Sequence, residues 1–140
     1  MKLSLILFAG ILALAASRCH QAKCHNHAGK KNVFLKPGQR LTAENGSSYL
    51  IMQEDGNLVL YCTKDNRVAW ASNTRGKNEL VFQEDGNLVM YSRDPKREVK
   101  WQAGSHNKGA IRLHLQNDGN LVIYNAEKDV WATNTNGKCN

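Results

Sequence analysis

One set of residues, two amides, a carboxylate, a valine and a phenol, recurs three times along the chain with the same alternating spacing. The three copies read MQEDGNLVLY around Asp55, FQEDGNLVMY around Asp85 and LQNDGNLVIY around Asp118. The amides donate and accept hydrogen bonds, the carboxylate accepts them, and the phenol does either. With the small apolar surface of valine, this set suits a polyhydroxylated ring, which has hydroxyls at its edge and C–H groups on its face. Because the set contains no lysine, arginine or nucleophile–base pair, it favours sugar binding over phosphate binding or catalysis.

Each copy predicts a β-hairpin. Apolar and β-branched runs flank the tripeptides EDG, EDG and NDG, and a three-residue loop that ends in glycine suits a type I turn followed by a G1 bulge. The residues expected to lie opposite one another in the first hairpin are Gln53 and Asn57, Ile51 and Val59, and Tyr49 and Tyr61. A two-residue Asp-Gly loop would mix polar and apolar residues on both faces, so we expect the three-residue register.

That register gives each hairpin one wholly apolar face. The twelve core candidates are Leu50, Met52, Leu58, Leu60, Leu80, Phe82, Leu88, Met90, Leu113, Leu115, Leu121 and Ile123. A tryptophan follows each hairpin, at Trp70, Trp101 and Trp131, and the hairpins repeat at offsets of 30 and 33 residues. Such a period indicates one supersecondary unit used three times. We therefore expect an all-β domain in which three hairpins share one core.

The alternating pattern Gln-x-Asp-x-Asn-x-Val-x-Tyr resembles the sugar-binding signature of the monocot bulb-type, or snowdrop-type, mannose-binding lectins. The resemblance extends from about residue 32 to residue 137. It implies a β-prism II fold, in which three four-stranded antiparallel sheets are related by pseudo-threefold symmetry and one tryptophan per repeat points inward. The three sites that it implies are Gln53, Asp55, Asn57, Val59 and Tyr61 for site 1, Gln83, Asp85, Asn87, Val89 and Tyr91 for site 2, and Gln116, Asp118, Asn120, Val122 and Tyr124 for site 3.

The resemblance also implies the role of each signature residue and a function. In the family, Asp and Asn contact the axial O2 of mannose, Gln reaches O3, Tyr bonds O4 and Val touches the C3–C4 face. For this chain we expect calcium-independent binding of α-D-mannose with no cofactor, no metal and no enzymatic activity. The expected partners are mannose-containing glycans and glycoproteins, with no nucleic acid and no membrane insertion. A homodimer or higher homo-oligomer would cross-link or agglutinate mannose-rich surfaces, in defence.

The cysteines depart from the family pattern. Plant members place one cysteine inside the first signature and another before the second, where this chain has Gly56 and, approximately, Asn78. The four cysteines of the chain are Cys19, Cys24, Cys62 and Cys139. In an oxidising compartment an even number indicates two disulfides, with three connectivities that the sequence does not separate. We favour Cys62–Cys139 and Cys19–Cys24, with an intermolecular bridge as the alternative.

The first 17 residues predict a secretory signal peptide. A positive start precedes an apolar run from Leu3 to Ala16, and Ala15 and Ser17 supply the small residues for cleavage. The run of about 14 residues is short for a bilayer span. Cleavage would leave 140 − 17 = 123 residues. The expected organisation is a signal peptide at 1–17, a Cys/His-containing lead at 18–31 and a lectin domain at 32–140, in a secreted, extracellular protein.

The positive net charge first suggests that the protein binds anionic partners. The formal charge of +7 becomes 18 − 12 = +6 once Lys2 is removed with the signal. Since the repeated set holds no cation, we expect this charge in loops and termini, where it assists approach to anionic cell surfaces. The basic residues Arg93, Lys96, Arg97 and Lys100 are interpreted as a solvated loop, with an anionic-surface contact as the alternative. The competing function is a cationic antimicrobial or anionic-surface binder that uses the lectin fold as a scaffold.

Three smaller features complete the sequence. Asn45 begins an Asn-Gly-Ser sequon and is a candidate N-glycosylation site. His106 and His114 stand alone, which favours surface or strand positions over a site. Near the N-terminus, histidines follow Cys19 and Cys24, and we favour oxidised cysteines there over a metal site.

Overall fold

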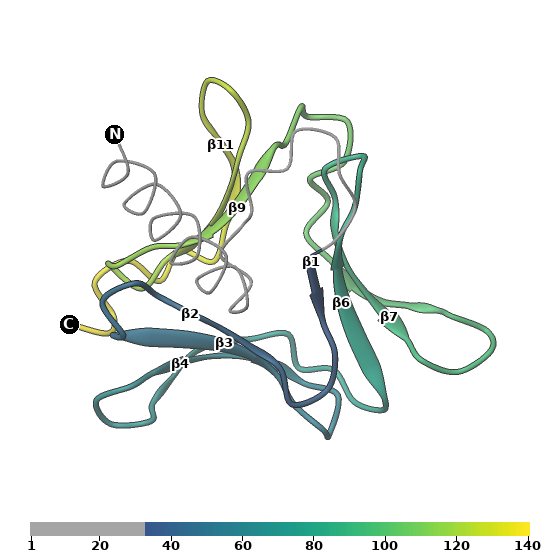
Figure 1. Ribbon diagram of the computed structural model, residues 1–140, viewed down its shortest axis with the longest axis horizontal. Coiled ribbons are helices and arrows are strands. Elements are labelled where there is room, and N and C mark those ends of the chain that lie inside the picture. Colours follow the sequence, from purple (N-terminus) through teal and green to yellow (C-terminus); the bar gives the residue numbers. More distant parts are fainter. Residues whose placement is uncertain (1–32) are drawn as a thin grey trace, which may run out of the picture.

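Three antiparallel β-sheets form the sides of a triangular prism (Figure 1). The computed structural model describes residues 33–140. The first sheet has the strand order β2-β3-β4-β5, the second β1-β6-β7-β8 and the third β9-β10-β11. The strands are β1 Val33–Leu35, β2 Arg40–Thr42, β3 Ser48–Met52, β4 Leu58–Cys62, β5 Val68–Ala71, β6 Asn78–Phe82, β7 Leu88–Ser92, β8 Val99–Gln102, β9 Arg112–Leu115, β10 Leu121–Tyr124 and β11 Asp129–Ala132. No helix in this part of the chain is long and apolar enough to cross a membrane.

The three-residue hairpin register is confirmed. Tyr49 lies opposite Tyr61 and Ile51 opposite Val59 in the β3–β4 pair, and the N–H of Gln53 donates to the carbonyl of Asn57 at 2.9 Å. The last residue of each turn is a glycine with positive φ, as the bulge requires. These are Gly56 at 87°, Gly86 at 81° and Gly119 at 83°.

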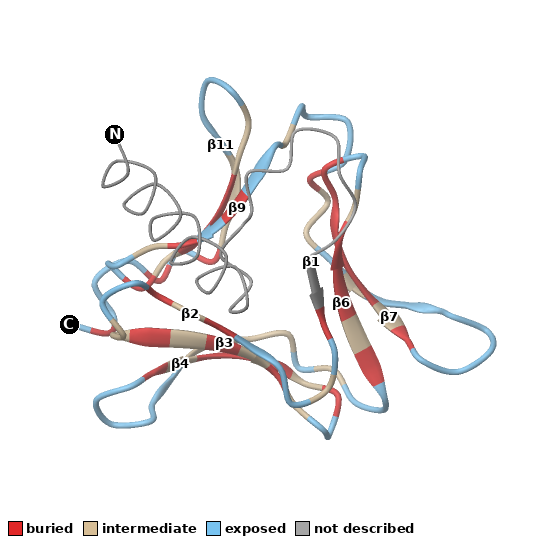
Figure 2. Ribbon diagram, viewed as in Figure 1, coloured by how far each residue is buried: buried red, intermediate tan, exposed pale blue. Residues whose placement is uncertain are grey.

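All twelve predicted core residues are buried, none of them more than 3% exposed. Buried positions recur along β3 and β6 in Figure 2, whereas the hairpin tips and long connections are exposed. The three tryptophans contact one another edge to face, with ring centroids 5.4 Å apart for Trp70–Trp101, 5.6 Å for Trp101–Trp131 and 6.2 Å for Trp70–Trp131. Such edge-to-face pairs add to the area that the rings bury. The shared core and the inward tryptophans therefore join the three repeats.

The prediction of three four-stranded sheets is wrong for the third sheet, which has three strands within residues 33–140. The first two sheets receive their outer strands, β2 and β1, from the segment before the first hairpin. After β11 the chain does not return to β9, because its C-terminal residues form turns beside the first sheet. The all-β class and the three-sheet architecture are as expected.

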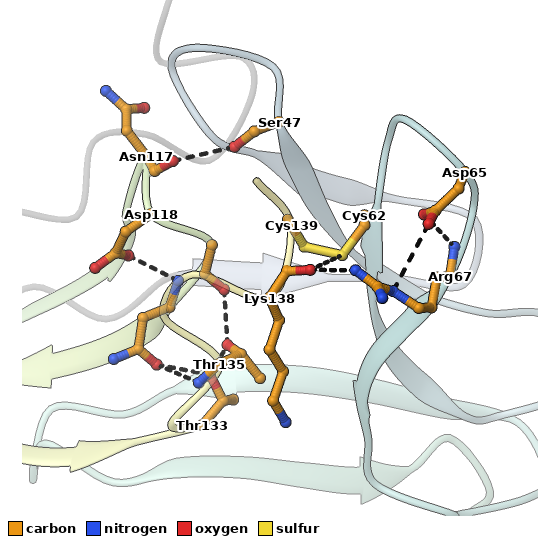
Figure 3. The surroundings of a disulfide bond; sticks show 12 residues. Ser47, Cys62, Asp65, Arg67, Asn117, Asp118, Thr133, Thr135, Lys138 and Cys139 are labelled. Carbon is orange, nitrogen blue, oxygen red and sulfur yellow. Dashed lines mark hydrogen bonds and ion pairs between the residues drawn. A yellow bond between two sulfur atoms is a disulfide. The ribbon is translucent and has the colours of Figure 1, made fainter.

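The predicted Cys62–Cys139 disulfide is present and bonds the end of β4 to the C-terminal segment (Figure 3). The guanidinium of Arg67 donates to the carbonyl of Lys138 at the same place. In the described part of the chain no cysteine is free. The signal peptide, the lead, the Cys19–Cys24 pairing and the histidines beside those two cysteines lie outside the described residues.

The two positions where the family pattern led us to look for cysteines are in contact. The side-chain N–H of Asn78 donates to the carbonyl of Gly56 at 2.8 Å, and Asn78 is fully buried. A Cβ built on Gly56 would lie 2.1 Å from the carbonyl oxygen of Gly76. A side chain does not fit at residue 56, and a hydrogen bond joins the two segments instead.

Candidate functional site

The outer face of each sheet brings together all five signature residues of one copy. Because cross-strand partners share a face, the register that buries Leu and Met inward turns Gln, Asn, Val and Tyr outward. In each site the Asp is exposed at the hairpin turn and the Gln and Tyr are half-buried. The valines are more covered than we expected, with exposed fractions of 2% for Val59, 2% for Val89 and 3% for Val122. Valine therefore offers only a small surface at the base of each site.

A hydrogen bond between Gln and Tyr spans each site. Nε2 of Gln53 donates to the hydroxyl of Tyr61 at 3.1 Å, and the equivalent bonds join Gln83 to Tyr91 and Gln116 to Tyr124. The contact uses the amide N–H of Gln and a lone pair of the phenol. It leaves the Gln Oε1 as an acceptor and the phenolic O–H as a donor.

The Asp of each copy closes its own turn. Oδ1 of Asp55 accepts the backbone N–H of Asn57 at 3.0 Å, and Asp85 and Asp118 do the same at 2.9 Å each. Short side chains of this kind favour turns because they bond the backbone two residues on. This contact holds the carboxylate at the tip and leaves Oδ2 as an acceptor.

Hydroxyl residues that the sequence analysis missed hold the signature asparagines. Oδ1 of Asn57 accepts from Oγ of Ser72 at 3.1 Å, and Oδ1 of Asn120 accepts from Oγ1 of Thr133 at 3.1 Å. The backbone N–H of Ser105 donates to Oδ1 of Asn87 at 3.0 Å. A signal was present, because WASNT, WQAGS and WATNT each place hydroxyls after the tryptophan. Each asparagine is thus oriented through its oxygen.

The free ends of these four side chains define what the sites offer. Each site presents two acceptors, from Asp and Gln, and donors from the Asn Nδ2 and the Tyr O–H. In site 2, Nδ2 of Asn87 also donates to Oε1 of Gln102 at 2.9 Å, so one of its two N–H groups is used. A ring with several hydroxyls satisfies this mixed set. Among residues 33–140 no group of three His, Cys, Asp or Glu is arranged to hold a metal.

An arginine lies over a tyrosine ring at every site. The signature alone did not predict these arginines. The guanidinium carbons of Arg97 and Arg112 lie 4.8 Å from the ring centroids of Tyr91 and Tyr124. In site 1, Tyr61 stacks on Tyr49 at 5.4 Å instead, and Arg40 lies 5.2 Å from the Tyr49 ring. Such cation–π contacts restrain the phenol.

The four basic residues between 93 and 100 are exposed, as expected of a solvated loop, but Arg97 also makes contacts at site 2. Its guanidinium covers Tyr91 and donates to Oε1 of Glu79 at 2.6 Å. The reason is register, because Glu79 lies opposite Tyr91 on the same face of the sheet. In site 3, Arg112 itself lies opposite Tyr124. In site 2, Glu79 takes that position and holds Arg97 over the tyrosine.

His114 occupies a strand position, as expected, but it lies on the outer face of site 3, opposite Val122. Partial burial, and then the charge of Arg112, lower the pKa of His114 below its usual value, while Glu44 and Asp118 act in the opposite direction. Asn45, the glycosylation candidate, is exposed next to this site, where its backbone and side chain bond Asn117.

Comparison with known proteins shows the family of this chain. No protein-family model matches the chain, and no curated protein matches it. Among solved structures, a lectin from Marasmius oreades is 31% identical with a TM-score of 0.65, covering 75% of this chain and 87% of its own. A monomeric monocot mannose-binding lectin from Gastrodia elata is 37% identical with a TM-score of 0.62, covering 75% and 94%. The mannose-specific agglutinin of snowdrop, Galanthus nivalis, solved with methyl-α-D-mannoside, is 39% identical with a TM-score of 0.58, covering 74% and 91%.

Three antiparallel sheets with a signature on each outer face define the β-prism II class of lectins. This chain belongs to the monocot mannose-binding, or snowdrop-type, lectin family.

Proposed function

We propose that this protein is a calcium-independent lectin that binds α-D-mannose at three sites, one on each sheet. The observation that supports this most directly is the shared arrangement of hydrogen bonds. In all three copies one end of each polar side chain is held by the protein, and the other end keeps at least one donor or acceptor for a hydroxyl-rich ring. The snowdrop and Polygonatum cyrtonema structures contain mannosides, which agrees with this chemistry.

Each site alone is expected to bind weakly. Four or five exposed hydrogen bonds, each contributing about 0.5–1.5 kcal/mol less the cost of association, correspond to about millimolar affinity for one monosaccharide. Sites on different faces of one chain bind a branched glycan surface with avidity raised by about 10²–10⁴. We infer that this valence cross-links mannose-rich surfaces. A role in defence is inferred only from the family and from the secretion that the N-terminal segment predicts.

The decisive experiment combines calorimetry with agglutination, both in EDTA. The native chain should bind methyl-α-D-mannoside in EDTA, and free mannose should inhibit its agglutination of mannose-rich cells. Replacing Gln53, Gln83 and Gln116 together by alanine removes the Gln–Tyr bond from every site and should abolish both activities. The melting temperature should stay close to that of the native protein, because the glutamines lie outside the core.

A matched control changes side chains next to the signatures without touching them. Glu54→Gln with Glu84→Gln alters two exposed turn residues beside Asp55 and Asp85 and should leave binding within about twofold. Normal agglutination by the triple glutamine variant would show that the site assignment is wrong. Binding that disappears in EDTA would contradict calcium independence.

A further inference from the structure

A hollow of about 320 Å³ lies at one end of the second sheet, where the chain enters β6 and leaves β7. Its volume falls within the range of about 300–1,000 Å³ typical of small-ligand sites. None of the residues that line it belongs to a mannose signature. The side chains that give it its character are Arg75, Lys77, Asn78, Arg93, Asp94 and Lys100.

Four cations face one carboxylate in this lining. Arg93 lies 3.9 Å from Glu79 and Lys100 lies 3.7 Å from Glu98, so these two are partly neutralised by residues outside the hollow. Arg75 and Lys77 are exposed, and neither forms an ion pair with any residue from 33 to 140. A concave surface with an excess of one charge concentrates ions of the opposite sign.

The same corner of the first sheet is closed. The segments after the first and third repeats read SNTRGKN, residues 72–78, and TNTNGKC, residues 133–139. In both, the glycine N–H donates to the backbone carbonyl of the turn aspartate, from Gly76 to Asp55 at 3.0 Å and from Gly137 to Asp118 at 2.8 Å. Asn78 therefore corresponds to Cys139.

The two corners differ in the contacts that Asn78 and Cys139 make with the sheet. Cys139 is bonded to Cys62 and closes the corner of the first sheet, whereas Asn78 faces Ser92 across the β6–β7 pair without a covalent bond. Arg75 stands where the third segment has Asn136. The positive charge of Arg75 thus distinguishes this corner from the corresponding corner of the first sheet.

The polar groups of the lining identify the class of ligand. Asp94 is held in place because its Oδ1 accepts from Oγ of Ser92 at 3.1 Å and from the N–H of Lys96 at 3.0 Å. A fixed carboxylate among cations can accept hydrogen bonds from free hydroxyl groups of a ligand whose anionic groups contact the cations. None of the lining residues is aromatic, so a nucleobase finds no ring on which to stack. We propose that this hollow binds an acidic saccharide, one that has sulfate or carboxylate groups and free hydroxyls, independently of the mannose sites.

The test measures binding of a heparin-derived tetrasaccharide to the full chain by calorimetry at moderate salt. Arg75→Gln with Lys77→Gln should weaken binding at least about tenfold, the loss expected for two charge-assisted contacts. Lys108→Gln with Lys128→Gln removes the same net charge from two exposed residues elsewhere and should change affinity less than about twofold. Saturating methyl-α-D-mannoside should not compete, and the desulfated, N-acetylated and carboxyl-reduced tetrasaccharide should not bind.

Equal losses in both double variants, or no loss in the first, would overturn the proposal, since binding would then follow overall charge. A single-stranded DNA oligonucleotide of equal charge that bound as tightly, and lost affinity with the same variant, would overturn the assignment to a saccharide. The triple glutamine variant separates the two functions, because it should keep tetrasaccharide binding while losing mannose.

Discussion

Asn45 and Asn117 form a two-point contact between the first and third repeats. The backbone N–H of Asn45 donates to Oδ1 of Asn117, and Nδ2 of Asn45 donates to the carbonyl of Asn117, both at 3.0 Å. Oγ of Ser47 adds a third bond to the same carbonyl (Figure 3). Asn117 stands where the other two turns have glutamate.

We predict that Asn117→Ala destabilises the protein by about 0.5–1.5 kcal/mol, the usual contribution of one hydrogen bond. The change removes the acceptor for the Asn45 N–H. The measurement is the free energy of unfolding in urea. Glu84→Ala, at the matching position of the second turn, should change it by less than about 0.5 kcal/mol. Equal effects of the two substitutions would mean that the contact does not stabilise the fold.

We predict that alanine substitution destabilises the protein to different extents at two glycines with positive φ. Gly46→Ala places Cβ in open space at φ 73°, so it should cost about 1–2 kcal/mol for the backbone conformation alone. Gly56→Ala places Cβ 2.1 Å from a backbone oxygen and should cost at least about 3 kcal/mol, because the turn must also move. Denaturant unfolding of both variants measures the difference. Similar losses for the two would contradict the close approach of Gly56 to Gly76.

Removing the Cys62–Cys139 disulfide should loosen the C-terminal segment. The bond closes a loop with a sequence separation of 77 residues, and bridges of this kind contribute about 2–4 kcal/mol to stability. Cys62→Ser with Cys139→Ser should lower the free energy of unfolding by that amount and increase amide exchange near Lys138. As a control, reductant should lower the unfolding free energy of the double variant less than that of the native chain. An unchanged unfolding free energy would show that the hydrogen bond from Arg67 suffices.

We predict that His114 makes the stability of the fold depend on pH under acidic conditions. Burial, followed by Arg112, lowers its pKa in the folded state, whereas the unfolded value is about 6.5. The unfolded chain therefore binds more protons between these values, so this contribution to stability is complete above about pH 6.5 and is lost as the pH falls. His114→Gln should flatten the decline of the melting temperature as the pH falls below about 6.5. An unchanged slope in that variant would assign the decline to other groups.

The sequence alone determined the hairpins and the residues of the three sites' outer faces. A one-residue slip would move Leu50 and Met52 to the surface and Gln53 inward, so the alternation of side chains specified the register before any tertiary contact was known. The positive φ of Gly56 was likewise predicted from its place in the turn. Local periodicity sufficed because burial of one face and the chemistry of the turn agree in every copy.

Tertiary structure decided how side chains outside each signature support the site and where the repeats leave space. Ser72 orients Asn57, Arg97 covers Tyr91 and Asn45 holds Asn117 through contacts 15, 6 and 72 residues apart. The third sheet has three strands, and the basic hollow forms, because of where the segment after each repeat runs in the folded chain. These features depend on which strand edges and loop ends meet in space, and the alternation within a single strand contains no information about that.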